Sequence, residues 1–300
     1  MAGDWGASGA RISPLVLLAA GIAMLFVAGR WFARRGVLTA PLLRQQGINL
    51  EATRPGASPL IWLCAHLDTK SQPIPTLLRT AGAMLEGLGY VITLGLTTAA
   101  LAGWQPHRSY WVIAALVTLV GALPVVLSIV TWQSPGALDN ASGVATVMAA
   151  ASQVANDRNV GVLITDAEEL GLAGARAWAH ERSEGDEAVL NCDGVDDDGR
   201  IVAMYSGRPP ERLLAALSRA AHGTSILPEP MRLIPGVLTD SVAFADSGLM
   251  SVTFSRGTWR SLARVHTRRD DLAHLHGTGI AETARLIAAT VRELAGGEMR

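Results

Sequence analysis

The stretch Leu163-Ile-Thr-Asp-Ala-Glu168-Glu169-Leu-Gly-Leu-Ala-Gly174 joins a β-branched apolar run to two adjacent carboxylates and a glycine-rich segment. This order predicts a buried strand that ends in a loop and is followed by a helix. One carboxylate of such a pair can bind a metal ion while its neighbour transfers a proton. A solvated acidic turn between a strand and a helix has the same local sequence, so the pair alone does not define a site.

Other potential metal ligands occupy similar strand-to-loop positions along the chain. They are His66 and Asp68 after the predicted strand 60–65, Asp139 before an alanine-rich helix, Asp193 after the predicted strand 188–192, and His266. In open α/β sheets, ligands bind outside the carboxyl ends of the strands. We therefore expect the residues that follow strands to gather there, together with the glutamate pair.

In this order, with the glutamate pair between Asp139 and Asp193, the motifs resemble those of peptidase family M28, zinc-dependent aminopeptidases that bind two co-catalytic zinc ions. The resemblance covers residues 60–70 and 133–275, and only the whole ordered set is specific. Further matches are 171–176, 239–244 and 266–270. The chain departs from the family pattern at Ser241, where a histidine is usual, and at Val265, where an aromatic residue is frequent. These departures concern transition-state contacts and substrate preference rather than metal binding.

The resemblance implies a role for each candidate residue. His66 and Asp193 would hold one zinc ion, Glu169 and His266 would hold the other, and Asp139 would bridge the two. Five protein ligands are too many for one catalytic zinc that keeps an open position, but they suit a pair of ions. Asp68 would orient the imidazole of His66, and Glu168 would be the general base. The implied reaction is hydrolysis of peptide bonds, with short peptides that have a free amine as substrates.

Strands and helices alternate through the second half of the chain, which predicts an α/β fold with a mixed, mostly parallel sheet sandwiched by helices. The predicted strands are 60–65, 160–165, 188–192, 201–205 and 250–254, and the predicted helices are 141–155, 173–181, 211–221 and 279–294. Residues 196–199 read Asp-Asp-Asp-Gly and predict a hairpin turn into strand 201–205. We assign these aspartates to structure; the alternative is a set of additional metal ligands.

The composition also predicts transmembrane segments, because hydrophobic residues make up 49% of the chain and charged residues 17%. Residues 12–28 form an apolar run that we interpret as a membrane anchor; a cleavable signal peptide is the alternative. Residues 81–102 and 110–130 are apolar and predict a transmembrane hairpin, with an amphipathic surface hairpin or buried soluble helices as alternatives. Glu86 in the first of these segments either marks a functional site or lies near enough to the interface to reach water.

These segments predict a chain with three membrane crossings. Residues 1–35 would form the N-terminal anchor, residues 36–76 and 131–300 a split zinc peptidase domain, and residues 77–130 the inserted hairpin. Positive residues are retained on the cytoplasmic side of a membrane. Arg30, Arg34, Arg35 and Lys70 flank the crossings on one side and Arg11 and Arg108 on the other, which predicts a cytoplasmic peptidase domain in the cell membrane. A reporter fused after Arg300 should therefore be active only inside the cell.

The sequence also excludes some functions and leaves others open. A net charge of −1 gives no electrostatic footprint for nucleic acid. Cys64 and Cys192 are predicted to be buried, reduced thiols, with a disulfide or a thiolate ligand as alternatives. The sequence carries no signal for an oligomeric state. Two functions compete with the dizinc peptidase: a glutaminyl-cyclase-like acyl transfer with a single zinc, and an inactive membrane module of the same fold.

Overall fold

The computed structural model describes residues 16, 19–24, 27, 46–182, 186–234 and 237–297. It divides into two compact units. One is a helical unit that includes residues 72–131, and the other is an α/β unit formed by residues 32–71 and 132–300. Much of the predicted anchor over 12–28 lies outside the described residues.

The α/β unit is built on a seven-stranded sheet with the order β1-β3-β2-β4-β7-β5-β6. The strands are β1 (Leu50–Ala52), β2 (Ile61–His66), β3 (Val160–Thr165), β4 (Ala188–Val195), β5 (Arg200–Tyr205), β6 (Glu229–Arg232) and β7 (Met250–Gly257). Neighbouring strands are parallel except for the pairs β1–β3 and β5–β7. The predicted mixed, mostly parallel sheet is confirmed.

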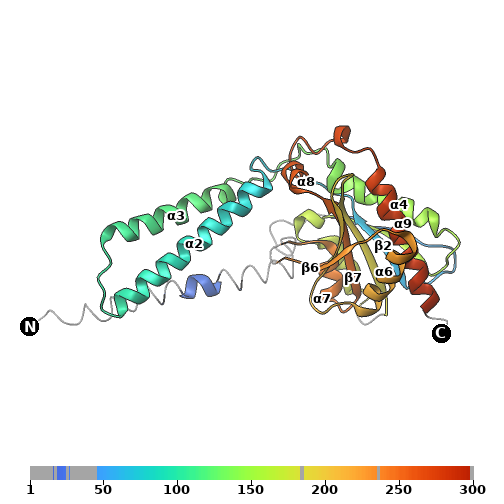
Figure 1. Cartoon of the computed structure of the whole chain (residues 1–300), viewed down its shortest axis with the longest axis horizontal. Helices are drawn as coiled ribbons and strands as arrows, with labels where there is room; N and C mark the ends of the chain where they lie inside the picture. The colour runs from blue at the N-terminus through green and yellow to red at the C-terminus, as the bar shows by residue number, and fades with distance from the viewer. Residues whose placement is uncertain are drawn as a thin grey trace, which may run out of the picture. The chain divides into compact units, whose positions relative to one another are not determined.

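Helices cover both faces of this sheet (Figure 1). They are α4 (Ser142–Gln153), α5 (Ala173–His180), α6 (Glu211–Thr224), α7 (Asp240–Asp246) and α9 (Thr278–Gly297), and a short helix α8 (Trp259–Arg264) follows β7. Along β2, Leu63 packs in the core beneath α4, α6 and α9, whereas Trp62 and Cys64 pack in the second core beneath α5 and α7. Both faces of β2 are therefore buried, which explains its nearly continuous apolar sequence. Cys64 and Cys192 are free, buried thiols, as predicted.

The hairpin predicted at residues 196–199 is wrong. β4 and β5 do not pair with each other, because β7 lies between them, parallel to β4 and antiparallel to β5. The Asp-Gly segment therefore passes across the end of β7. Gly199 is required there, since its φ is +92° and a Cβ atom would lie 2.2 Å from the carbonyl oxygen of Gly257. Asp197 accepts hydrogen bonds from the backbone at the start of α9, including one from Gly279 N at 2.8 Å, so it is structural.

The two short edge strands β1 and β6 and the two short helices α7 and α8 were not predicted. β1 precedes the first predicted strand, pairs with β3 and is exposed at all three positions. β6 has the sequence Glu-Pro-Met-Arg and pairs only with β5. A strand at a sheet edge pairs on one side only and has at least one solvent-exposed face. It therefore does not need the β-branched, apolar pattern that identifies a central strand.

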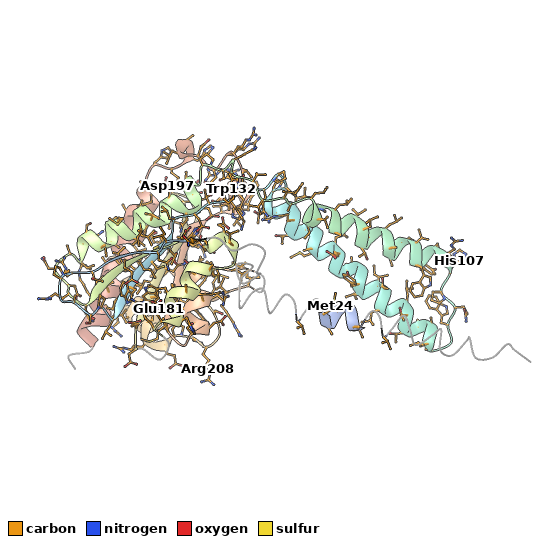
Figure 2. The ribbon with its side chains drawn as sticks, turned by 180° about the vertical axis from the view of Figure 1, so that it is seen from behind. Met24, His107, Trp132, Glu181, Asp197 and Arg208 are labelled. Atoms are coloured by element: carbon orange, nitrogen blue, oxygen red, sulfur yellow. The ribbon has the colours of Figure 1, made fainter. Side chains whose placement is uncertain are left out.

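The helical unit contains two long helices that run side by side, α2 (Thr76–Leu101) and α3 (Arg108–Val126) (Figure 1). His107 caps the start of α3 in the turn between them (Figure 2). Both helices are long and apolar enough to cross a membrane, and only 11% of the most apolar window of each is buried. The apolar side chains therefore point mainly outward, which does not fit the alternative of two buried helices in a soluble core.

Small residues allow α2 and α3 to approach closely. A Cβ atom on Gly121 would lie 2.3 Å from the backbone nitrogen of Glu86, and one on Gly89 would lie 2.2 Å from Oγ1 of Thr118. Glu86 itself is half-buried beside this contact. The hydroxyl groups of Thr93, Thr97, Thr98 and Thr118 donate to carbonyl oxygens four residues earlier. Close packing at small residues, with polar groups satisfied inside the helices, is typical of helix pairs in membranes.

The chain leaves and re-enters the α/β unit at adjacent positions. The backbone nitrogen of Gln133 donates to Oγ of Ser71 at 2.6 Å. The side chain of Gln133 also accepts a hydrogen bond from Arg268 at 2.7 Å. These contacts lie within the α/β unit and hold together the two points between which residues 72–131 are inserted.

Candidate metal centre

His66 is the last residue of β2, and its ring orientation is fixed by the loop that follows. Nδ1 lies 2.9 Å from the backbone oxygen of Asp68. A carbonyl oxygen can only accept, so Nδ1 carries the hydrogen of the neutral ring and Nε2 presents its lone pair. Nε2 is buried, has no hydrogen-bond partner among the described residues, and lies 3.2 Å from Oδ1 of Asp139 and 3.6 Å from Oδ1 of Asp193.

His266 approaches the same cluster from the loop after α8, with a left-handed φ of 65°. Its Nε2 lies 2.9 Å from Oδ2 of Asp139 and 3.0 Å from Oε1 of Glu169. Asp139 thus turns one carboxylate oxygen toward each histidine. A left-handed backbone costs a non-glycine residue roughly 1–2 kcal/mol, which the surrounding contacts must offset to hold the imidazole in place.

The two glutamates stand in a 3-10 turn, Glu168–Leu170, at the end of β3. The carboxylate of Asp68 holds this turn, since Oδ1 accepts from Glu168 N at 3.0 Å and Oδ2 accepts from Glu169 N at 3.1 Å. Asp68 Oδ1 is 3.5 Å from His66 Nδ1. Asp68 therefore orients His66 chiefly through its backbone oxygen, while its carboxylate positions the glutamate pair.

The structure gathers the predicted ligands into two groups. Asp139, Glu169 and His266 form one, and His66 and Asp193 form the other together with Glu168; within each group the ligand atoms lie within 4.8 Å of one another. Asp193 lies where the pairing of β4 with β7 shifts register, between Cys192 and Val195. The carboxyl ends of β2, β3 and β4 therefore supply four of these six residues, as expected of an α/β sheet.

Without a cation, the buried charges of the cluster repel one another and attract protons. Burial raises the pKa of the Glu168 carboxyl well above its ordinary value, and the nearby Asp193 and Glu169 add to this rise. Burial opposes protonation of His266, yet Asp139 and Glu169 raise its pKa to about 9. A divalent cation would take the place of these protons, so metal binding at this cluster should release protons.

Two further residues position Asp139. Asp270 accepts hydrogen bonds from Leu138 N at 2.6 Å and from Asp139 N at 3.1 Å. Asn140 donates to the carbonyl oxygen of Cys192 at 2.9 Å and so connects the Asp139 loop to the end of β4. Sequence reasoning assigned neither role. Asp270 belongs to the segment 266–270, which matches the family pattern. The residues that it holds lie more than 130 positions away in the chain, so the sequence did not reveal its role.

Ser241, which replaces the usual family histidine, is fully buried at the start of α7. Its Oγ lies 3.0 Å from Oγ1 of Thr239 and accepts a hydrogen bond from Oγ1 of Thr253 at 2.8 Å. The neighbouring Asp240 accepts from Thr165 at 2.5 Å, and burial raises its pKa to about 6. Ser241 is thus engaged in a hydroxyl cluster and offers no imidazole to a substrate.

The donor set fits zinc. Imidazole nitrogen and carboxylate oxygen are ordinary zinc ligands, and the buried atoms Nε2 of His66 and Oε1 of Glu169 lack hydrogen-bond partners among the described residues. Buried polar atoms without partners are rare in proteins. Their position beside Asp193 and Asp139 fits bound cations better than a set of hydrogen bonds.

Comparison with known families agrees with this geometry. Residues 124–291 match the model of peptidase family M28. The chain belongs to this family. The match includes Asp139, the glutamate pair, Asp193 and His266, whereas His66 and Asp68 precede it. The resemblance inferred from the ordered motifs is confirmed.

Solved structures resemble the fold of this M28 chain at low sequence identity. A zinc aminopeptidase from Bacillus subtilis has a TM-score of 0.53 and 18% identity, covering 83% of this chain and 50% of its own. The LapA aminopeptidase of Legionella pneumophila has a TM-score of 0.53 and 16% identity, covering 93% of this chain and 63% of its own. This chain therefore spans about half the length of the Bacillus enzyme.

A third structure is matched over a larger share of its own length. The glutaminyl cyclase of Fimbriiglobus ruber has a TM-score of 0.50 and 17% identity, with 82% of this chain and 75% of its own covered. A search of curated proteins gave no match. These similarities establish the shared fold, and the reaction must be argued from the site.

Proposed function

We propose that this M28 chain is a membrane-bound dizinc aminopeptidase that hydrolyses short peptides. The observation that carries the proposal is the carboxylate of Asp139, which lies between two histidines and turns one oxygen toward each. A carboxylate that offers one oxygen to each side can bridge two neighbouring cations. His66 and Asp193 would hold one ion, and Glu169 and His266 the other.

Glu168 would then carry the proton transfers. Zinc ions bound here would supply Lewis acidity, which polarises a substrate carbonyl and makes a water molecule acidic near neutral pH. Glu168 is buried beside His66 and Asp193, and its backbone is fixed by Asp68. In our proposal its carboxylate accepts a proton from the attacking water and donates it to the departing amine.

The membrane part of the proposal rests on α2 and α3, which have the length and hydropathy of spanning helices. A third crossing near the N-terminus rests on the apolar run at residues 12–28. A cytoplasmic α/β unit rests on the distribution of positive residues described above. In such a protein the two ends of the hairpin, at Ser71 and Trp132, would lie close to the headgroup region.

The function can be tested on the full chain purified in detergent. We expect two zinc ions per chain by elemental analysis, hydrolysis of aminoacyl anilides and free-amine peptides, and no hydrolysis of the same peptides after N-acetylation. If the acetylated peptides were cleaved as fast as the free-amine peptides, the protein would be a peptidase but not an aminopeptidase. Absence of cleavage in a zinc-loaded chain would contradict both.

A glutaminyl-cyclase-like acyl transfer is the second candidate, because a solved glutaminyl cyclase shares the fold over 82% of this chain. The same purified protein separates the two functions. One zinc ion per chain, together with cyclisation of peptides that begin with glutamine, would favour acyl transfer over hydrolysis.

A further inference from the structure

Lys70 contacts the proposed zinc ligand Glu169 directly, and it is the only lysine of the chain. Its ammonium group forms a close ion pair with Oε2 of Glu169. The exposed fractions of the two side chains are 18% for Lys70 and 5% for Glu169, so water screens the pair poorly. Sequence reasoning gave Lys70 only a part in membrane topology.

The backbone on both sides of Lys70 is held in place. Two residues earlier, the carboxylate of Asp68 accepts hydrogen bonds from the backbone of Glu168 and Glu169. One residue later, Ser71 accepts a hydrogen bond from Gln133 N at 2.6 Å. The loop therefore delivers the ammonium group to Glu169 from a fixed position rather than from a freely moving surface side chain.

The ion pair divides the two oxygens of Glu169 between different partners. Oε2 faces Lys70, whereas Oε1 lies 3.0 Å from Nε2 of His266 and has no hydrogen-bond partner among the described residues. An ion at this position would therefore meet a single oxygen of Glu169. The ammonium group would also place a like charge on the opposite side of the same carboxylate, which weakens cation binding in a poorly screened site.

We propose that Lys70 is a positioning residue that reserves one oxygen of Glu169 for the cation and lowers the zinc affinity of the group Asp139, Glu169 and His266. This inference rests on the proposed dinuclear site and deepens it. The two zinc positions of the chain then differ in affinity, and the position that contains His266 is the weaker one.

The test compares zinc binding of the full chain in detergent with that of Lys70→Met, which keeps the length of the side chain and removes its charge. Competition with a chromophoric chelator should show that the weaker ion binds about tenfold more tightly to Lys70→Met. Lys70→Arg keeps the charge and should resemble the wild type. In a His266→Ala background, Lys70→Met should leave the affinity of the remaining ion unchanged, because the coupled position is absent.

Thermal unfolding provides a second readout. Lys70→Met removes one positive partner of the buried Glu169 carboxylate, so the zinc-free protein should melt at a lower temperature than the wild type, and zinc should raise its melting temperature by a larger interval. If Lys70 had only a structural role, Lys70→Met would lower the melting temperatures of the zinc-free and the zinc-bound protein by equal amounts. That result, or an unchanged zinc affinity in a chain that binds two ions, would overturn the inference and leave the proposed function intact. A wild-type chain with no zinc at the His266 position would overturn both.

Discussion

Glu168→Gln should lower kcat by a factor of roughly 10²–10⁴, the usual contribution of a positioned general base, while both zinc ions remain bound. Glutamine has nearly the shape of glutamate but cannot take up a proton. In the proposed site Glu168 is the buried carboxylate that is not assigned to a zinc ion, so its loss should affect proton transfer more than metal binding. The measurement is steady-state hydrolysis of an aminoacyl anilide, combined with elemental analysis of the same sample.

Glu181→Gln is the matched control, because its side chain is 78% exposed and lies at the end of α5. It should leave kcat and zinc content unchanged. If Glu168→Gln retained the kcat of the wild type, the assignment of Glu168 as the base would fail. If it instead lost one zinc ion, Glu168 would be a ligand of the group that contains His66 and Asp193.

Asp139→Asn should have the second large effect, on both metal content and activity. The amide keeps one oxygen and replaces the other with an NH₂ group, which cannot bind a cation. Since the oxygens of Asp139 face His66 and His266 separately, the variant can serve only one of the two positions. We expect at least one zinc ion per chain to be lost and kcat/KM to fall below that of Glu168→Gln.

Asp198→Asn provides the matched control for this substitution, since Asp198 is exposed in the segment between β4 and β5. Elemental analysis and hydrolysis should give wild-type values for the control. An Asp139→Asn protein that kept two zinc ions and an unchanged kcat/KM would exclude a bridging role for Asp139. A site with a single ion, or with ions bridged by another residue, would then have to be considered.

The central part of the fold could be predicted because its residues carry strong local signals. The predicted strand 160–165 coincides with β3, which is covered on both faces and therefore consists of apolar and β-branched residues. The edge strand β1 lacks that pattern because it has one partner and is exposed. The Asp-Gly segment before β5 predicted a hairpin that is not formed. Turn residues indicate that the chain changes direction, but they do not specify which strand pairs with the one that follows.

Three of the proposed ligands, His66, Glu169 and Asp193, could be located because metal-binding residue types follow predicted strands. Asp139 and His266 lie outside strands and were assigned through the resemblance to the M28 motifs. The residues that support the ligands have no such signature. Asp270 and Lys70 act on Asp139 and Glu169 through contacts between distant parts of the chain. An aspartate that accepts backbone hydrogen bonds, or a lysine that pairs with a buried glutamate, has the same sequence appearance as a surface residue. Such partners become visible only when the loops are folded together.

The hydrogen bond between Gln133 and Ser71 has an implication for the engineering of the chain. It joins the residues on either side of the segment that contains α2 and α3. A linker of a few residues could bridge this gap without changing the register of any strand. Removal of the helical segment together with the predicted anchor over residues 12–28 should therefore yield a water-soluble α/β unit that keeps the proposed metal site.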